Sequence, residues 1–285
     1  MRILFIFLII LSTSVLQAKS IFGNDEQVQN SIYTDALKNL LIATQKTRGL
    51  TNSYINGNTS AMLLVYAARD EMKSAIGEME STTLAADPVI NARATAISQA
   101  LIKLNRKAFK MKAEEAFSAY TEQISNILML AQTVSKRLSS KLSPFGKDAT
   151  SIMMETMLPL TEQVGQLRGF GAGLAAKKKA NKEEHAKLNV LMKRVRKLNL
   201  KMQKELTLLV SKYPSKVSSD ILIETKKIDN MIFAYTELVK NRFKNRQIIV
   251  DPDKFFEDGT TIIGQIIAAY NKINKAILED SKGWF

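Results

Sequence analysis

Two arginines occupy matching places in this chain, and each is followed by a glycine, at residues 48–49 and 168–169. A helix turns by about 100° per residue, so Leu37 and Leu41 lie within about 20° of Arg48 around a helix. Arg48 therefore falls in the middle of an apolar stripe, and the same arithmetic applies to the second arginine. We expect both guanidinium groups to point into a bundle or an interface.

A guanidinium group buried without a partner is costly, because arginine cannot escape by losing its proton. Each of the two arginines, Arg48 and Arg168, must therefore face an anionic or carbonyl-rich group of its own. The partner could be an internal acid such as Glu162, Glu122 or Asp70. It could instead be a ligand, because the planar fork of arginine donors suits an oxyanion or a carboxylate better than lysine does. The sequence leaves both alternatives open.

Glycine at positions 49 and 169 would let two helices approach closely and bring backbone near the arginines. Tyr120 could hydrogen-bond a ligand there, although a buried tyrosine in a bundle usually finds a backbone or water partner. Gly49 and Gly169 are therefore included in the predicted site together with Tyr120.

The composition excludes several kinds of catalytic and metal site. The 285 residues include no Cys and one His, which rules out thiolate nucleophiles, zinc ribbons, iron–sulfur clusters and sites that need two histidines. Paired carboxylates for general acid–base work are not evident. We interpret Met153, Met154 and Met157 as core residues rather than a copper site. The sequence thus predicts no enzyme activity, no cofactor and no metal site.

The elements that must position the arginines are helices. Hydrophobic residues make up 46% of the chain, and there are only 12 Gly and 5 Pro. Unbranched residues such as Ala, Leu, Lys, Met and Gln are plentiful, and they lose little rotamer freedom in a helix. The sequence therefore predicts an all-α fold.

Turn signals divide the chain into eight helices. We place them at about 25–54, 60–83, 88–110, 112–143, 148–178, 181–212, 215–247 and 252–280. The segment Ser143-Pro-Phe-Gly-Lys-Asp148 has the composition of a linker. Short connections favour antiparallel neighbours, so we expect two tandem four-helix bundles, at 24–143 and 148–282.

The first 18 residues have the pattern of a secretory signal peptide. Arg2 precedes the apolar run Ile3 to Leu11, and the small residue Ala18 stands where a signal peptidase would cut. The run is too short to span a bilayer. Export combined with the lack of cysteine indicates a bacterial periplasm. The alternative is an uncleaved N-terminal helix that anchors the protein.

The net charge of +14 is unusually positive. Much of it lies in two stretches, Lys177 to Lys204 and Lys226 to Arg246, which we interpret as solvated helix faces. Attraction of anionic headgroups or of a small anion is the alternative. Nucleic acid is not an expected partner, because no recognition motif accompanies the charge.

Three segments carry a resemblance to a known family. Residues 45–54 resemble the first-helix signature of the nitrate- and nitrite-sensing domain family, residues 113–130 resemble its fourth helix, and residues 255–263 resemble the start of its last helix. The resemblance implies two four-helix bundles and an anion site that uses one arginine from each, here Arg48 and Arg168. The ligand-binding set expected on this basis is Arg48, Arg168, Gly49, Gly169, Gln45, Thr44 and Tyr120.

These observations lead to an expected function. We expect a free-standing periplasmic sensor that recognises a small anion, nitrate or nitrite first, and signals through a membrane receptor or sensor kinase. A homodimer is left open. The alternative is a structural or protein-interaction bundle that neutralises its arginines internally and has no small-molecule ligand.

Overall fold

A computed structural model describes residues 24–245 and 247–282 of the chain. The predicted signal peptide, residues 1–18, lies outside these described residues. The helices are α2 (Asp25–Ile55), α3 (Ala61–Glu80), α4 (Pro88–Lys107), α5 (Ala113–Leu138), α6 (Pro144–Ile152), α7 (Leu158–Lys177), α8 (Lys182–Lys212), α9 (Asp220–Arg242) and α10 (Pro252–Ser281). None of these helices is long and apolar enough to cross a membrane.

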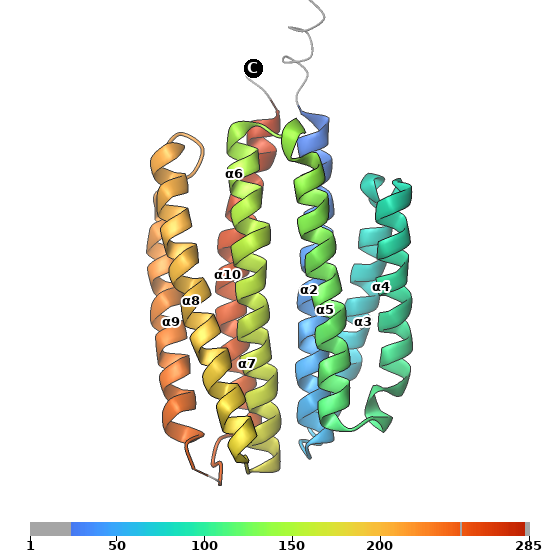
Figure 1. Ribbon diagram of the computed structural model, residues 1–285, viewed down its shortest axis with the longest axis vertical. Coiled ribbons are helices and arrows are strands. Elements are labelled where there is room, and N and C mark those ends of the chain that lie inside the picture. The colour runs from blue at the N-terminus through green and yellow to red at the C-terminus, as the bar shows by residue number, and fades with distance from the viewer. Residues whose placement is uncertain (1–23, 246, 283–285) are drawn as a thin grey trace, which may run out of the picture.

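The helices form two four-helix bundles, as predicted. Helix α6 continues into α7 through the π-helical turn Met153–Met157, so the two form one long helix and the described residues contain eight helices. Helices α2 to α5 form the first bundle, and α6–α7, α8, α9 and α10 form the second (Figure 1). The predicted all-α architecture is therefore confirmed.

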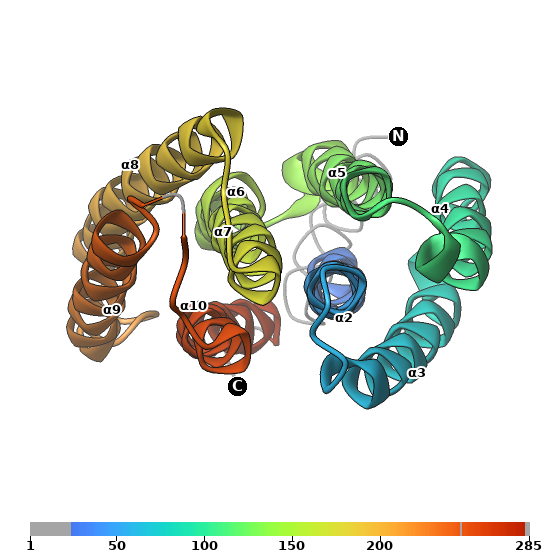
Figure 2. The same cartoon turned by 90° about the horizontal axis from the view of Figure 1, so that it is seen from below.

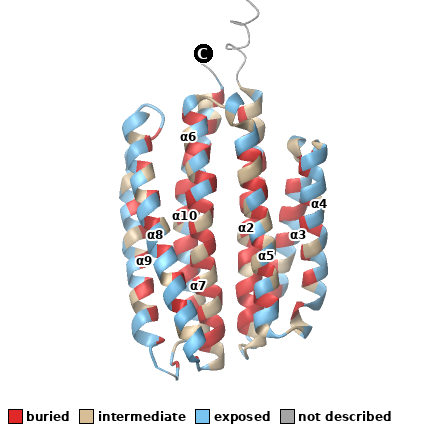
Figure 3. Cartoon of the chain, viewed as in Figure 1, coloured by how far each residue is buried: buried red, intermediate tan, exposed pale blue. Residues whose placement is uncertain are grey.

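The two bundles share a broad interface. Seen along the helices, α2, α5, α7 and α10 lie together in the centre, while α3 and α4 lie on one outer side and α8 and α9 on the other (Figure 2). A single apolar cluster extends through both bundles. Buried residues are accordingly concentrated on the central helices (Figure 3).

Several helices begin at side-chain caps that can be recognised in the sequence. The Asp87 carboxylate accepts hydrogen bonds from the backbone of the first turn of α4, and Asp251 does the same for α10. A proline follows each of these caps, where its missing N–H costs nothing. Asn181 and Glu184 form a reciprocal capping box at the start of α8.

The linker predicted over residues 143–148 is wrong, because this segment is the capped start of α6. The Ser143 hydroxyl accepts a hydrogen bond of 2.9 Å from the backbone of Gly146, and Pro144 is the first helical residue. A Cβ atom on Gly146 would lie 2.4 Å from the Gln27 side chain, so a larger residue there would displace the Gln27 amide. Ser, Pro and Gly are common both in linkers and at helix starts, so composition alone did not distinguish the two.

Other helix ends differ from the predictions by a few residues. The helix expected over 215–247 spans only Asp220–Arg242. Phe243 and Ile248, in the segment that follows it, are buried in the core. The helix expected over 60–83 ends at Glu80 and is followed by the short 3₁₀ turn Thr83–Ala86.

The first and last helices are joined where they meet at one end of the molecule. The backbone N–H of Asn24 donates a 2.8 Å hydrogen bond to the carbonyl of Ser281. Beside it, the Asp280 carboxylate accepts hydrogen bonds from Gln27 and Ser143 and forms a 2.9 Å ion pair with Lys216. This carboxylate therefore links the start of α2, the start of α6 and the end of α10.

Candidate functional site

Helices α2 and α7 lie side by side and run in the same direction. Later residues of α2 contact later residues of α7: Gln45 bonds to Thr161, and Asn52 bonds to the carbonyl of Gly169. A Cβ atom on Gly49 would lie 3.2 Å from Cα of Gly169, and one on Gly169 would lie 2.9 Å from Cα of Gly49. The close helix approach expected from the two glycines is therefore confirmed.

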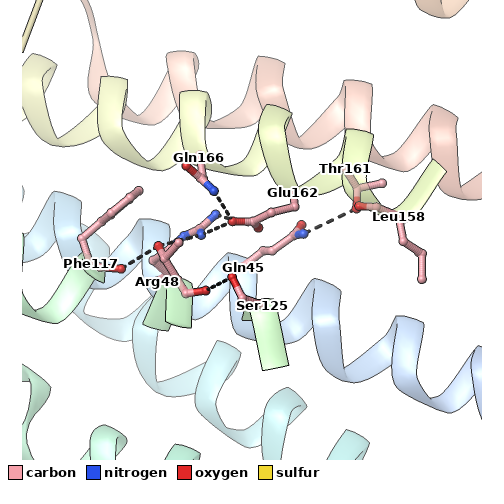
Figure 4. A network of polar contacts seen from close by, with 9 residues as sticks. Gln45, Arg48, Phe117, Ser125, Leu158, Thr161, Glu162 and Gln166 are labelled. Carbon is pink, nitrogen blue, oxygen red and sulfur yellow. Dashed lines mark hydrogen bonds and ion pairs between the residues drawn. The ribbon is translucent and has the colours of Figure 1, made fainter. Parts of the chain in front are cut away.

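Arg48 is fully buried and paired with an internal carboxylate. Its two terminal nitrogens donate to the two oxygens of Glu162 at 2.6 and 3.1 Å, and Nη1 also donates to Thr121 at 3.0 Å (Figure 4). The guanidinium carbon lies 4.9 Å from the centre of the Phe117 ring. Glu162 accepts a further 2.7 Å hydrogen bond from Gln166. Both carboxylate oxygens are therefore used.

The internal-acid alternative thus holds for Arg48. Of the three candidate acids, only Glu162 is buried, whereas Glu122 and Asp70 are exposed. The pair is bidentate, the geometry in which a carboxylate and a guanidinium bind most strongly.

Arg168 is also buried but has no carboxylate partner. Its Nη1 donates to the Thr260 hydroxyl at 2.8 Å, and its guanidinium carbon lies 4.2 Å from the centre of the Phe256 ring. Within the described residues it forms no ion pair, and its buried Nε has no hydrogen-bond partner. Burial lowers the pKa of Arg168 to about 10. It is therefore a cation at neutral pH that no carboxylate of the described residues contacts directly.

The surroundings of the two arginines repeat each other. Phe117 and Thr121 near the start of α5 contact Arg48, and Phe256 and Thr260 near the start of α10 contact Arg168. In both helices the threonine follows the phenylalanine by four residues, which places the two side chains on one face. The two halves of the molecule therefore build the same arginine environment.

The repetition breaks at one position. Glu162, which pairs with Arg48, stands six residues before Arg168, and the residue six before Arg48 is Ile42. Because Gly49 lies opposite Gly169 on parallel helices, position 42 is the counterpart of position 162. Ile42 is partly buried against the apolar core. The first half therefore has isoleucine at the position where the second half has glutamate.

Of the other residues predicted for the site, Gln45 lies at the α2–α7 interface, whereas the hydroxyl groups of Thr44 and Tyr120 bond elsewhere. Gln45 is buried beside Arg48, and its Oε1 has no hydrogen-bond partner. Thr44 instead donates to the carbonyl of Leu40 and contacts Met72 of α3. Tyr120 donates a 2.7 Å hydrogen bond to Asn105, outside the α2–α7 contact.

Sequence reasoning missed the residues that hold the guanidinium groups in place. Phe117, Phe256 and Thr260 were not predicted, although the same Phe-x-x-x-Thr spacing near the start of the last helix of each half could have identified them. Gly259 was also missed. A Cβ atom there would lie 2.8 Å from the Arg168 side chain, so glycine makes room for that arginine.

A groove of about 520 Å³ opens between the bundles, and neither arginine is among its lining residues. Phe117 lines this groove and contacts Arg48, and the Lys187 ammonium lies 5.5 Å from the centre of its ring. Burial lowers the pKa of Lys187. Its charged lining residues are Lys177 and Lys187 together with Glu114, Glu183 and Glu184, so the groove carries both signs of charge.

Comparisons with known proteins identify the family and the fold. The chain matches the nitrate and nitrite sensing family over residues 39–281, which include both arginines and all of both bundles except the start of α2. It is similar to the structure of the NasR transcription antiterminator, with a TM-score of 0.64 and 13% sequence identity over 97% of this chain and 74% of that one. At that identity the likeness shows a shared fold. No curated protein matches the chain. The family match spans most of the sequence, and the chain therefore belongs to the nitrate and nitrite sensing family.

Proposed function

We propose that this protein is a non-enzymatic sensor that binds nitrate or nitrite between its two bundles, with Arg168 as the main anion-binding residue. The observation that carries the proposal is the buried Arg168 guanidinium, which has no carboxylate partner in the described residues. A buried cation left unpaired costs free energy, and an anion bound beside it would remove that cost.

The chemistry of Arg168 suits a small planar oxyanion. Nη1 is held by Thr260, while the buried Nε–H is unused. A guanidinium offers parallel N–H groups that match two oxygens of a planar anion. The Phe256 ring packs against one face of the guanidinium and limits how that side chain can turn.

Arg48 has a different role in this proposal. Its charge is already balanced by the bidentate pair with Glu162, although its Nε, like that of Arg168, has no hydrogen-bond partner in the described residues, so Arg48 supports the site instead of clamping the anion. The two-arginine clamp implied by the family resemblance thus becomes a one-arginine site next to an internal ion pair.

Signalling would follow from the location of the site. An anion held where α2 and α7 touch would contact residues of both bundles, so its binding would favour one relative packing of the bundles over another. We propose that a membrane receptor or sensor kinase reads this difference. Two copies of the chain could assemble for the same purpose.

Export to the periplasm is part of the proposal. The pattern of residues 1–18 supports it, and we expect a mature protein that begins near Lys19. N-terminal sequencing of protein from a periplasmic extract tests this. Recovery of an intact product beginning at Met1 in the membrane fraction would support an uncleaved anchor instead.

Thermal unfolding with a panel of anions tests the binding. A ligand that binds only the folded state stabilises it by RT ln(1 + [L]/Kd), about 2.7 kcal/mol at a hundredfold excess over Kd. Nitrate and nitrite should raise the melting temperature relative to acetate at matched ionic strength. Arg168→Met should abolish the shift, and Arg106→Met, at an exposed arginine, should keep it. No shift with either anion would favour a structural bundle instead.

A further inference from the structure

We propose that Glu162 sets the net charge of the interface so that it accepts one monovalent anion and rejects divalent ones. This rests on the proposed function, because it concerns the selectivity of the same site. It assigns to Glu162 a role in specificity that is separate from its structural pairing with Arg48.

The set of buried charged residues supports this role of Glu162. In the part of the chain that the structure describes, the buried charged residues are Lys38, Arg48, Glu162 and Arg168. Lys38 pairs with Asp35 at 2.6 Å and donates to Asn271 of α10. The remaining three form one cluster at the α2–α7 contact, where the glycines that follow the two arginines meet and Glu162 bonds to Arg48. Two guanidinium groups and one carboxylate leave this cluster with one net positive charge.

One net positive charge matches one monovalent anion. Nitrate or nitrite would bring the buried cluster to neutrality, whereas sulfate would leave one uncompensated negative charge. Uncompensated charges are costly in the low dielectric of a protein interior, where charge interactions are much stronger than in water. The cluster should therefore discriminate by charge.

The proposal requires that the Glu162 carboxylate remain paired with Arg48 when an anion binds. Its two oxygens accept hydrogen bonds from Arg48, and one of them also accepts from Gln166. These contacts hold the carboxylate in place, so it is not free to turn toward Arg168. Arg168 thus keeps its charge available for the ligand.

A second variant adds a carboxylate to the cluster at the position where the repeat of the two halves is not kept. Position 42 on α2 is the counterpart of position 162 on α7, and it carries isoleucine. Ile42→Glu should place a second carboxylate toward Arg168 and bring the cluster to neutrality without a ligand. Ile42→Gln is the matched control, because it has nearly the same shape and no charge.

Calorimetric titration with nitrate and with sulfate, on the full mature chain at matched ionic strength, tests the proposal. We expect the wild-type protein to bind nitrate at least tenfold more tightly than sulfate. Glu162→Gln should lower the ratio of sulfate Kd to nitrate Kd at least tenfold, because the cluster then carries two positive charges. Ile42→Glu should lose nitrate binding, and Ile42→Gln should keep it.

The outcomes separate this proposal from the one on which it rests. Failure of the wild-type protein to bind nitrate or nitrite would overturn the proposed function. Nitrate binding with an unchanged nitrate-to-sulfate ratio in Glu162→Gln would overturn only the role of Glu162. A purely structural Glu162 would change both affinities together and leave their ratio constant. If Glu162→Gln does not fold, as circular dichroism would show, the comparison of Ile42→Glu with Ile42→Gln decides, and equal nitrate binding by the two overturns the proposal.

Discussion

Glu162 accepts hydrogen bonds from both terminal nitrogens of Arg48, at 2.6 and 3.1 Å, across the contact between the two bundles. The matching arginine of the second bundle, Arg168, has no such carboxylate in the part of the chain that the structure describes. Two positions that look alike in the sequence therefore differ in charge environment. This difference leads to opposite expectations for the same substitution.

Replacing each arginine by methionine should change stability in opposite directions. Arg48→Met would leave the Glu162 carboxylate buried without its partner, which costs roughly 3 to 5 kcal/mol. Arg168→Met removes an unpaired buried cation, so the ligand-free protein should be no less stable than the wild type. Urea unfolding of both variants without added anion measures this. Equal and large destabilisation by the two substitutions would mean that Arg168 has an internal counter-charge after all.

The contact between Gly49 and Gly169 should not tolerate side chains. In Gly169→Ala the new Cβ atom would lie 2.9 Å from the Cα atom of Gly49, and backbone cannot yield as a flexible side chain can. We expect a loss of about 1 to 3 kcal/mol in the free energy of unfolding. Gly264→Ala is the control, because position 264 is helical and open. There alanine should stabilise by about 0.5 to 1 kcal/mol. Similar effects at both positions would contradict the close helix contact.

Asp280 should stabilise the protein in a pH-dependent way. Burial alone would raise the pKa of Asp280, but hydrogen bonds from Ser143, Lys216 and Gln27 outweigh burial and lower it. The folded-state pKa is thus below the unfolded value of about 3.9. The stabilisation is therefore fully present above that value and is lost as the pH falls through the folded-state pKa.

Unfolding of Asp280→Asn across a pH series tests this account of Asp280. At neutral pH the variant should be less stable than the wild type by about 1 to 3 kcal/mol. The difference should shrink as the pH falls below about 4. Glu279→Gln is the control, since the Glu279 side chain is 60% exposed and surface ion pairs contribute little. A gap between Asp280→Asn and the wild type that does not change with pH would contradict the argument.

Much of the fold could be predicted because helix starts and turns have local signals. Asp87 and Asp251, each followed by proline, mark the starts of α4 and α10, and the structure places both helices there. The same kind of signal misled at Ser143 and Pro144, since a cap and a linker share their residues. Burial of the two arginines also followed from the apolar stripe around them.

The pairing within the site could not be predicted, because it depends on how two distant helices lie against each other. Glu162 meets Arg48 because α2 and α7 are parallel and in register at Gly49 and Gly169. A helix-by-helix reading of the sequence gives neither direction nor register. The direction of the Thr44 hydroxyl, which bonds to the carbonyl of Leu40 within α2, was likewise not given by its place on the helix.

A crystal structure of the mature protein grown with nitrate tests the central claim most directly. We predict a planar anion within hydrogen-bond distance of the Arg168 guanidinium at the α2–α7 interface, with the Arg48–Glu162 pair intact. Nitrate bound away from Arg168, or an Arg168 guanidinium that instead pairs with a carboxylate of the protein, would contradict the account.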